Sequence, residues 1–135
     1  MDVLKSILIH GPNGGLPYDY GRLFEFTCTV SSIINLDKHP IHLDITVHPT
    51  YIRSYPDAMG LCYEKDEDHV EIHLARKCVE GLRNDLYLTL THELLHARQT
   101  CLNQKMYERP VRKNEEFIYQ LAKERLSEKN NVCRL

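Results

Sequence analysis

Two histidines four residues apart, with a glutamate directly after the first, stand in the segment LTLTHELLHARQ at residues 88–99. On a helix, side chains four apart share one face, so His92 and His96 can direct both imidazoles at one cation. Glu93 is rotated away and does not reach the same coordination point. It can instead hold water on the ion and take its proton, because zinc lowers the pKa of bound water to about 7. The spacing therefore predicts Zn²⁺ ligated by His92 and His96, with Glu93 as general base.

A catalytic zinc usually has three protein ligands, so the chain must supply one more. No histidine follows His96, and the metzincin extension is missing, which excludes that class. The segment RKNEEFIYQLAKE at residues 112–124 offers two acids on a predicted helix. We favour Glu115, at the edge of the apolar stripe of that helix, and keep Glu116 as the alternative. Cys101 is a weaker candidate because it lies away from the imidazoles.

The elements that must position these side chains follow from hydrophobic periodicity. Apolar residues at steps of four, four, three and four predict a helix around the histidine pair, and Asn84 or Asp85 can cap its start. The stripe consists of Leu86, Leu90, Leu94, Ala97 and Cys101. His92 and His96 project from the opposite face, so this helix is expected to bury one side and present both imidazoles on the other.

A second helix is predicted downstream, over about 113–129, with Pro110 in the loop just before it. Its expected inward side chains are Phe117, Ile118, Leu121, Ala122 and Leu126. Upstream, strict alternation predicts a strand over 40–49 and a hairpin over 59–76 with an acidic turn. The segment 19–36 fits both helical and strand spacing, and we favour a helix.

These elements predict one domain over residues 1–135, of the α+β class. A small mixed β-sheet of about three strands would pack on an N-terminal helix, the HExxH helix and a C-terminal helix. The net charge of −2 gives no electrostatic reason to expect a nucleic acid or membrane partner. No signal peptide is recognised, and the five scattered cysteines form no CxxC pair, so we expect reduced thiols and a cytoplasmic location.

The segment THELLHARQ followed by NEEFIYQLA resembles the gluzincin metallopeptidases, above all minigluzincins, SprT-like domains and ImmA/IrrE-type peptidases. The resemblance spans residues 40–126. It implies a zinc-dependent peptidase acting on a protein or peptide, with His92, His96 and Glu115 as ligands and Glu93 as base. It also implies an edge strand at 59–63 that binds extended peptide. The chain departs from the family pattern in two ways, so the subfamily is not determined. Ile118, three residues after Glu115, stands where the family has a small residue or an acid, and the zinc ribbon of SprT-like proteins is missing.

Two other functions remain in view. A zinc-binding regulatory or protein-interaction module would keep this fold and cut little or nothing, although the complete HExxH argues against a dead site. A DNA-associated SprT-like protease is disfavoured by the near-neutral charge and the missing ribbon. Tyr107, Tyr119 and Arg112 could stabilise an oxyanion, but packing or surface roles are the better expectation. The six remaining histidines are expected on the surface or on polar strand faces.

Overall fold

The structure is a computed structural model that describes residues 3–76 and 86–133. In these residues a four-stranded mixed sheet has the order β1-β2-β4-β3. Strands β1 (Ser6–His10), β2 (His42–His48) and β4 (His69–Ala75) run parallel, and β3 (Gly60–Asp66) pairs antiparallel with β4 at the edge. The predicted α+β class, the strand within 40–49 and the 59–76 hairpin are confirmed.

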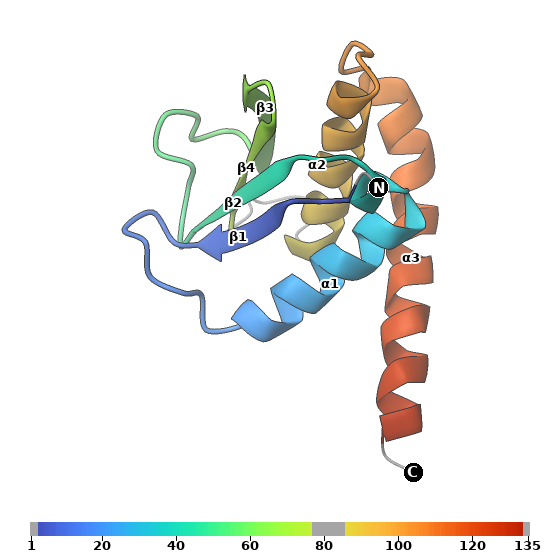
Figure 1. Cartoon of the computed structure of the whole chain (residues 1–135). Helices are drawn as coiled ribbons and strands as arrows, with labels where there is room; N and C mark the ends of the chain where they lie inside the picture. The colour runs from blue at the N-terminus through green and yellow to red at the C-terminus, as the bar shows by residue number, and fades with distance from the viewer. Residues whose placement is uncertain (1–2, 77–85, 134–135) are drawn as a thin grey trace.

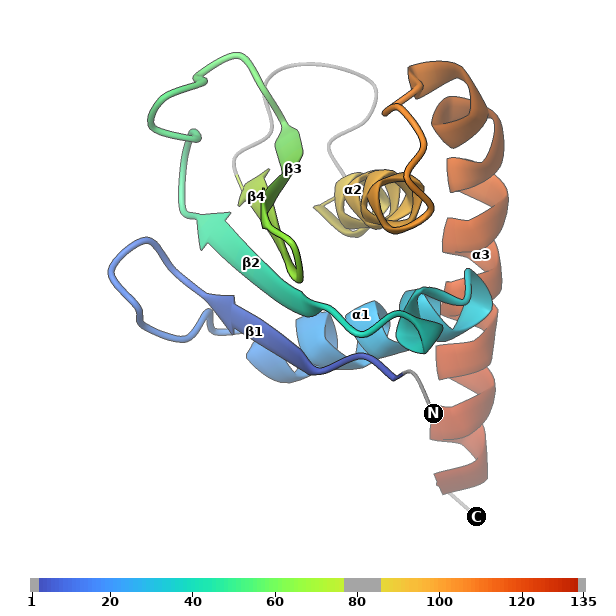
Figure 2. The ribbon, with the colours of Figure 1, turned by 45° about the horizontal axis from the view of Figure 1, so that its top comes forward.

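Two helices cover one face of the sheet, and a third helix packs on these two (Figures 1 and 2). Helices α1 (Tyr20–Ile33) and α2 (Leu86–Cys101) contact the strands, and α3 (Glu108–Cys133) packs on both of these helices. The favoured helix within 19–36 is therefore confirmed. A short 3-10 helix, Leu36–Lys38, joins α1 to β2. The proposed cap at residues 84 and 85 lies outside the described residues. In the described chain no helix is both long and apolar enough to cross a membrane.

The core lies between the sheet and the helices. Alternate strand side chains such as Leu43, Ile45 and Ile72 are fully buried there, and they meet Leu90 and Leu94 of α2. Burial of this kind contributes roughly 1.5–3 kcal/mol for each large aliphatic side chain. This core fixes α2 against the sheet and thereby sets the position of the histidine pair.

Strand β1 was not predicted from the sequence. Its segment SILIH is only five residues long, and its partner β2 begins at His42, far along the chain. Parallel pairing needs such a distant partner, which local alternation cannot reveal. Ile9 of β1 is fully buried, so pairing with β2 adds a strand to the predicted sheet.

Helix α3 differs from its prediction in start and orientation. It begins at Glu108, so Pro110 lies in its first turn, where a backbone N–H has no partner within the helix. Phe117, expected inward, is 68% exposed. Of the other residues expected inward, Ala122 is buried and Ile118 and Leu126 pack against the core, as predicted. The buried face also carries Val111, Glu115 and Tyr119, which were not in the predicted set. Burial of apolar surface favours this orientation, and the contact with His92 offsets the cost of burying the Glu115 carboxylate.

Helix α2 is enclosed more fully than its one-sided apolar stripe indicated. Its stripe packs on the core as predicted, but Glu93 and His96 on the other side are also buried. The coverage comes from α3 and β3, which both contact α2. The imidazoles therefore line a pocket and do not project into open solvent.

Candidate metal centre

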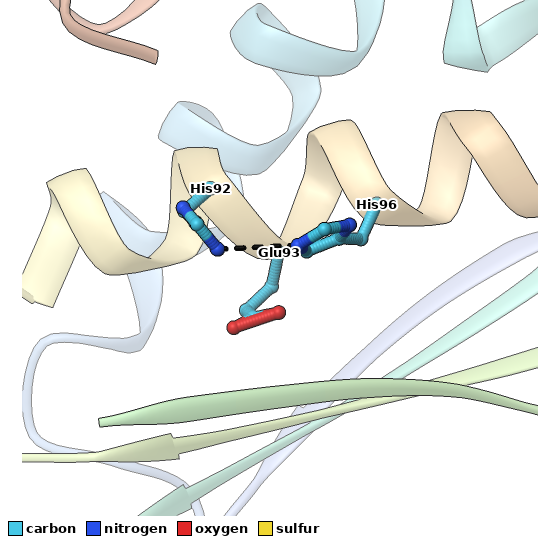
Figure 3. Close-up of side chains that lie close together, drawn as sticks. All are labelled: His92, Glu93 and His96. Carbon is cyan, nitrogen blue, oxygen red and sulfur yellow. Dashed lines mark hydrogen bonds between the residues drawn. The ribbon is translucent and has the colours of Figure 1, made fainter. Parts of the chain in front are cut away.

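His92 and His96 converge as their four-residue spacing predicts. Their Nε2 atoms are 3.2 Å apart, and their rings stand at 74° to one another (Figure 3). Ligand atoms of His92, Glu93 and His96 all lie within 4.8 Å of one another. The group is therefore compact enough to hold a metal ion.

The other nitrogen of each ring has an oxygen partner. His92 Nδ1 is 2.6 Å from Glu115 Oε2, and His96 Nδ1 is 2.9 Å from Gln99 Oε1. The amide of Gln99 is oriented by its own nitrogen, which donates to the Tyr107 carbonyl at 3.1 Å. Carboxylate and amide oxygens accept hydrogen bonds, so the Nδ1–H of each ring donates to its partner. The two Nε2 atoms are turned towards each other.

Glu115 lies on the buried face of α3 and is only 3% exposed. It contacts Nδ1 of His92, and its place among the metal ligands stays a prediction. Glu116 projects into solvent on the neighbouring face. The structure brings Glu115, and not Glu116, up to the histidine pair.

Two residues at this site were not predicted. Glu108, the first residue of α3, places Oε1 2.8 Å from His96 Nε2 and Oε2 3.2 Å from His92 Nε2. Although partial burial opposes it, the nearby histidines and Arg112 lower the pKa of Glu108. Gln99 is the second residue. Its position three after His96 on one helix was a usable signal, whereas Glu108 lay in what the sequence presented as a loop.

Glu93 points from α2 towards the sheet, between the two histidines (Figure 3). Burial raises its pKa to about 8, and the negative charges of Glu108 and Glu115 act in the same direction. Strand β3 passes close by at Gly60, where an added Cβ would lie only 2.7 Å from Glu93 Oε2. Strand β3 and helix α2 therefore come close together at Gly60 because this residue has no side chain.

A pocket of about 460 Å³ opens beside the histidine pair. One wall is the 59–62 part of the β3 arm, and the opposite wall is α2 with the start of α3. Of the three oxyanion candidates, Arg112 lines this pocket, and its Nε is 3.4 Å from Glu108 Oε2. Tyr119 is buried on α3 against Phe26, which fits the packing role expected for it.

None of the other six histidines lines this pocket, and all of them except His39 lie in strands. His48 contacts His73, which lies 3.3 Å from Glu71 on the polar side of the sheet. His42 and His69 stack across β2 and β4 with ring centroids 4.6 Å apart. These contacts agree with the polar strand-face positions that their alternation predicted.

In comparisons with family models, curated proteins and solved structures, nothing matches this chain. The chain's own side chains form a candidate His-Glu-His metal centre on helix α2.

Proposed function

We propose that this chain is a zinc-dependent peptidase, in which His92 and His96 hold the ion through Nε2 and Glu93 is the general base. The single observation that carries the proposal is the pair of Nε2 atoms turned towards each other, 3.2 Å apart. The Glu108 carboxylate meets the same two nitrogens, so two imidazoles and a carboxylate converge on one point. A divalent cation at that point would take the place of any protons that the two nitrogens carry.

The separation also fits the ion. Ligand nitrogens at about 2.0–2.1 Å from a tetrahedral zinc stand roughly 3.3–3.4 Å apart. Imidazole nitrogen and carboxylate oxygen are both ordinary zinc donors. Oxygens that accept the Nδ1–H hydrogen bond and so fix the ring orientation, as those of Gln99 and Glu115 do here, are a common feature of histidine metal sites. A carboxylate from α3 would complete the ligand set, and Glu115 was the residue predicted for it.

A bound zinc ion would polarise a peptide carbonyl and acidify water. Glu93 would take a proton from that water and later deliver it to the leaving amine. Its burial between α2 and β3 keeps it in an apolar setting, where a carboxylate accepts a proton more readily than in water.

Strand β3 supports a protein or peptide as the substrate. It is the last strand of the described sheet, so one of its edges is available for an extended peptide to join as a further strand. Its first residues line the pocket beside Glu93. A peptide added there would place its backbone carbonyls along the wall that faces the histidine pair.

The test combines metal content with cleavage. We expect about one equivalent of zinc per wild-type chain by mass spectrometry of the metal, and cleavage of members of a peptide library. Glu93→Gln should keep the zinc and lower kcat/KM by about 10²–10⁴-fold, the usual contribution of a general base. Glu116→Gln, an exposed change of the same kind on α3, is the matched control and should behave as wild type.

Three outcomes distinguish the peptidase from the alternative functions. Cleavage by Glu93→Gln at the wild-type rate removes Glu93 as the base. Zinc bound without cleavage of the library or of partner proteins favours the regulatory module. A wild-type chain that binds no transition metal rejects the proposal as a whole.

A further inference from the structure

We infer that Glu108 is the carboxylate that completes the coordination of the ion, and that Glu115 orients His92 from the Nδ1 side. This inference rests on the proposed function and refines it. It divides the two carboxylates of α3 into a ligand and a positioning residue, and it places the ligand seven residues earlier on the helix than the sequence indicated.

The argument starts from which nitrogen each carboxylate meets. Glu108 spans both Nε2 atoms, with one oxygen 2.8 Å from His96 and the other 3.2 Å from His92. Ligands around one tetrahedral ion stand roughly 3.3 Å apart, so the 3.2 Å separation is near that of a filled site and the 2.8 Å separation would widen slightly on metal binding. Glu115 meets Nδ1 of His92 at 2.6 Å. The two nitrogens of an imidazole point in different directions, so an oxygen bonded at Nδ1 lies away from an ion at Nε2.

The electrostatics point the same way. The two Nε2 atoms and the Glu108 carboxylate can each give a lone pair to a metal ion, and they lie within about 3.2 Å of one another. A divalent cation at their centre would be attracted to all three groups. Glu115 and His92 form a satisfied donor–acceptor pair that needs no ion.

The chain also holds Glu108 in place from both sides. Gln99 binds His96 through its oxygen and the carbonyl of Tyr107 through its nitrogen, and Tyr107 directly precedes Glu108. On the outer side Arg112 lies 3.4 Å from the carboxylate. The Glu108 side chain is 55% exposed, so it sits at the mouth of the pocket and leaves the inner side of the ion open to water and substrate.

The direct test is a crystal structure of the zinc-loaded protein with anomalous data at the zinc edge. We expect an ion about 2.0–2.2 Å from both Nε2 atoms and from a Glu108 oxygen, with Glu115 still on Nδ1. An ion ligated by Glu115, with Glu108 turned into solvent, overturns the inference and leaves the peptidase proposal standing. A wild-type protein with no ion between the rings overturns both.

A solution measurement separates the two roles by zinc affinity, read by competition with a chromophoric chelator. Glu115→Gln should weaken zinc binding about 10- to 100-fold, as loss of an orienting partner does. Glu108→Gln should weaken it more than Glu115→Gln, and Glu116→Gln should not change it. A smaller loss for Glu108→Gln than for Glu115→Gln contradicts the assignment.

The melting temperature of the metal-free proteins guards against a folding artefact. Glu108 is exposed at the start of a helix, so Glu108→Gln should melt within about a degree or two of wild type without zinc. Its affinity loss then reports lost coordination. Glu108→Asp keeps the charge and should recover part of the lost affinity, which a purely structural role of the residue would not predict.

Discussion

Gly60→Ala tests the contact between β3 and the general base. A Cβ at this position would lie 2.7 Å from Glu93 Oε2, 2.8 Å from Thr89 Cγ2 and 3.0 Å from Glu93 Cγ. Carbon and oxygen atoms pack comfortably at about 3.5 Å or more, so the methyl group overlaps both neighbours. The Thr89 methyl belongs to a β-branched side chain on a helix, which has few alternative rotamers. The strand must therefore move away from α2, or Glu93 must turn.

The expected cost follows from two opposing effects. Inserting a methyl into a packed interface typically costs about 1–3 kcal/mol. Replacing glycine by alanine where the backbone permits it returns about 0.4–1 kcal/mol by restricting the unfolded chain. The net loss in the free energy of unfolding should be about 1–2 kcal/mol. Displacement of Glu93 should also lower kcat/KM, because a general base must lie within hydrogen-bond reach of its proton.

Urea unfolding at neutral pH measures the stability change, and peptide cleavage measures the effect on Glu93. Gly21→Ala is the matched control, because nothing lies within 4 Å of a Cβ there and the site is on α1. It should be neutral or stabilising by up to about 1 kcal/mol. Adding Thr89→Ser to Gly60→Ala removes one overlapping methyl and should restore part of the stability. If Gly60→Ala is as stable and as active as wild type, the close approach of β3 to Glu93 is refuted.

Two further predictions concern the scaffold. Asp19→Asn should lower the free energy of unfolding, measured by urea titration, by about 1–3 kcal/mol. The reason is that the half-buried Arg76 contacts both carboxylate oxygens of Asp19, at 2.7 and 3.2 Å. A change below about 0.5 kcal/mol would show that this ion pair contributes little to stability. The hydrogen bond to Glu71 raises the pKa of Tyr63 to about 12, so its stabilisation is complete below about pH 10 and is lost as the pH rises towards 12. Tyr63 is 43% exposed, so solvent screening limits this to about 1 kcal/mol or less, and wild type should lose that much more than Tyr63→Phe between pH 9 and 12. If the free energies of unfolding of wild type and Tyr63→Phe change with pH in parallel, the contribution of this hydrogen bond is refuted.

The local geometry of the site was determined by the sequence. Helical periodicity alone places His92 and His96 on one face and sets Glu93 apart from them, because those relations depend on a single helix turn. The strand within 40–49 and the hairpin within 59–76 were equally readable, since their alternation is also local. The core side of α2 followed from the same rule.

The packing of α3 on the other helices determines the features that the sequence did not predict. Phe117 and Tyr119 are both aromatic residues on α3, and only the packing of that helix on α1 and α2 decides that Phe117 is exposed while Tyr119 is buried. The same packing brings Glu115 to Nδ1 of His92. Because α3 begins at Glu108, this residue also reaches both Nε2 atoms. Periodicity says which residues share a face, whereas the direction of that face depends on the partners that bury it. The two histidines were therefore predictable from one helix, and the carboxylates that meet them became known only when a second helix packed across the first.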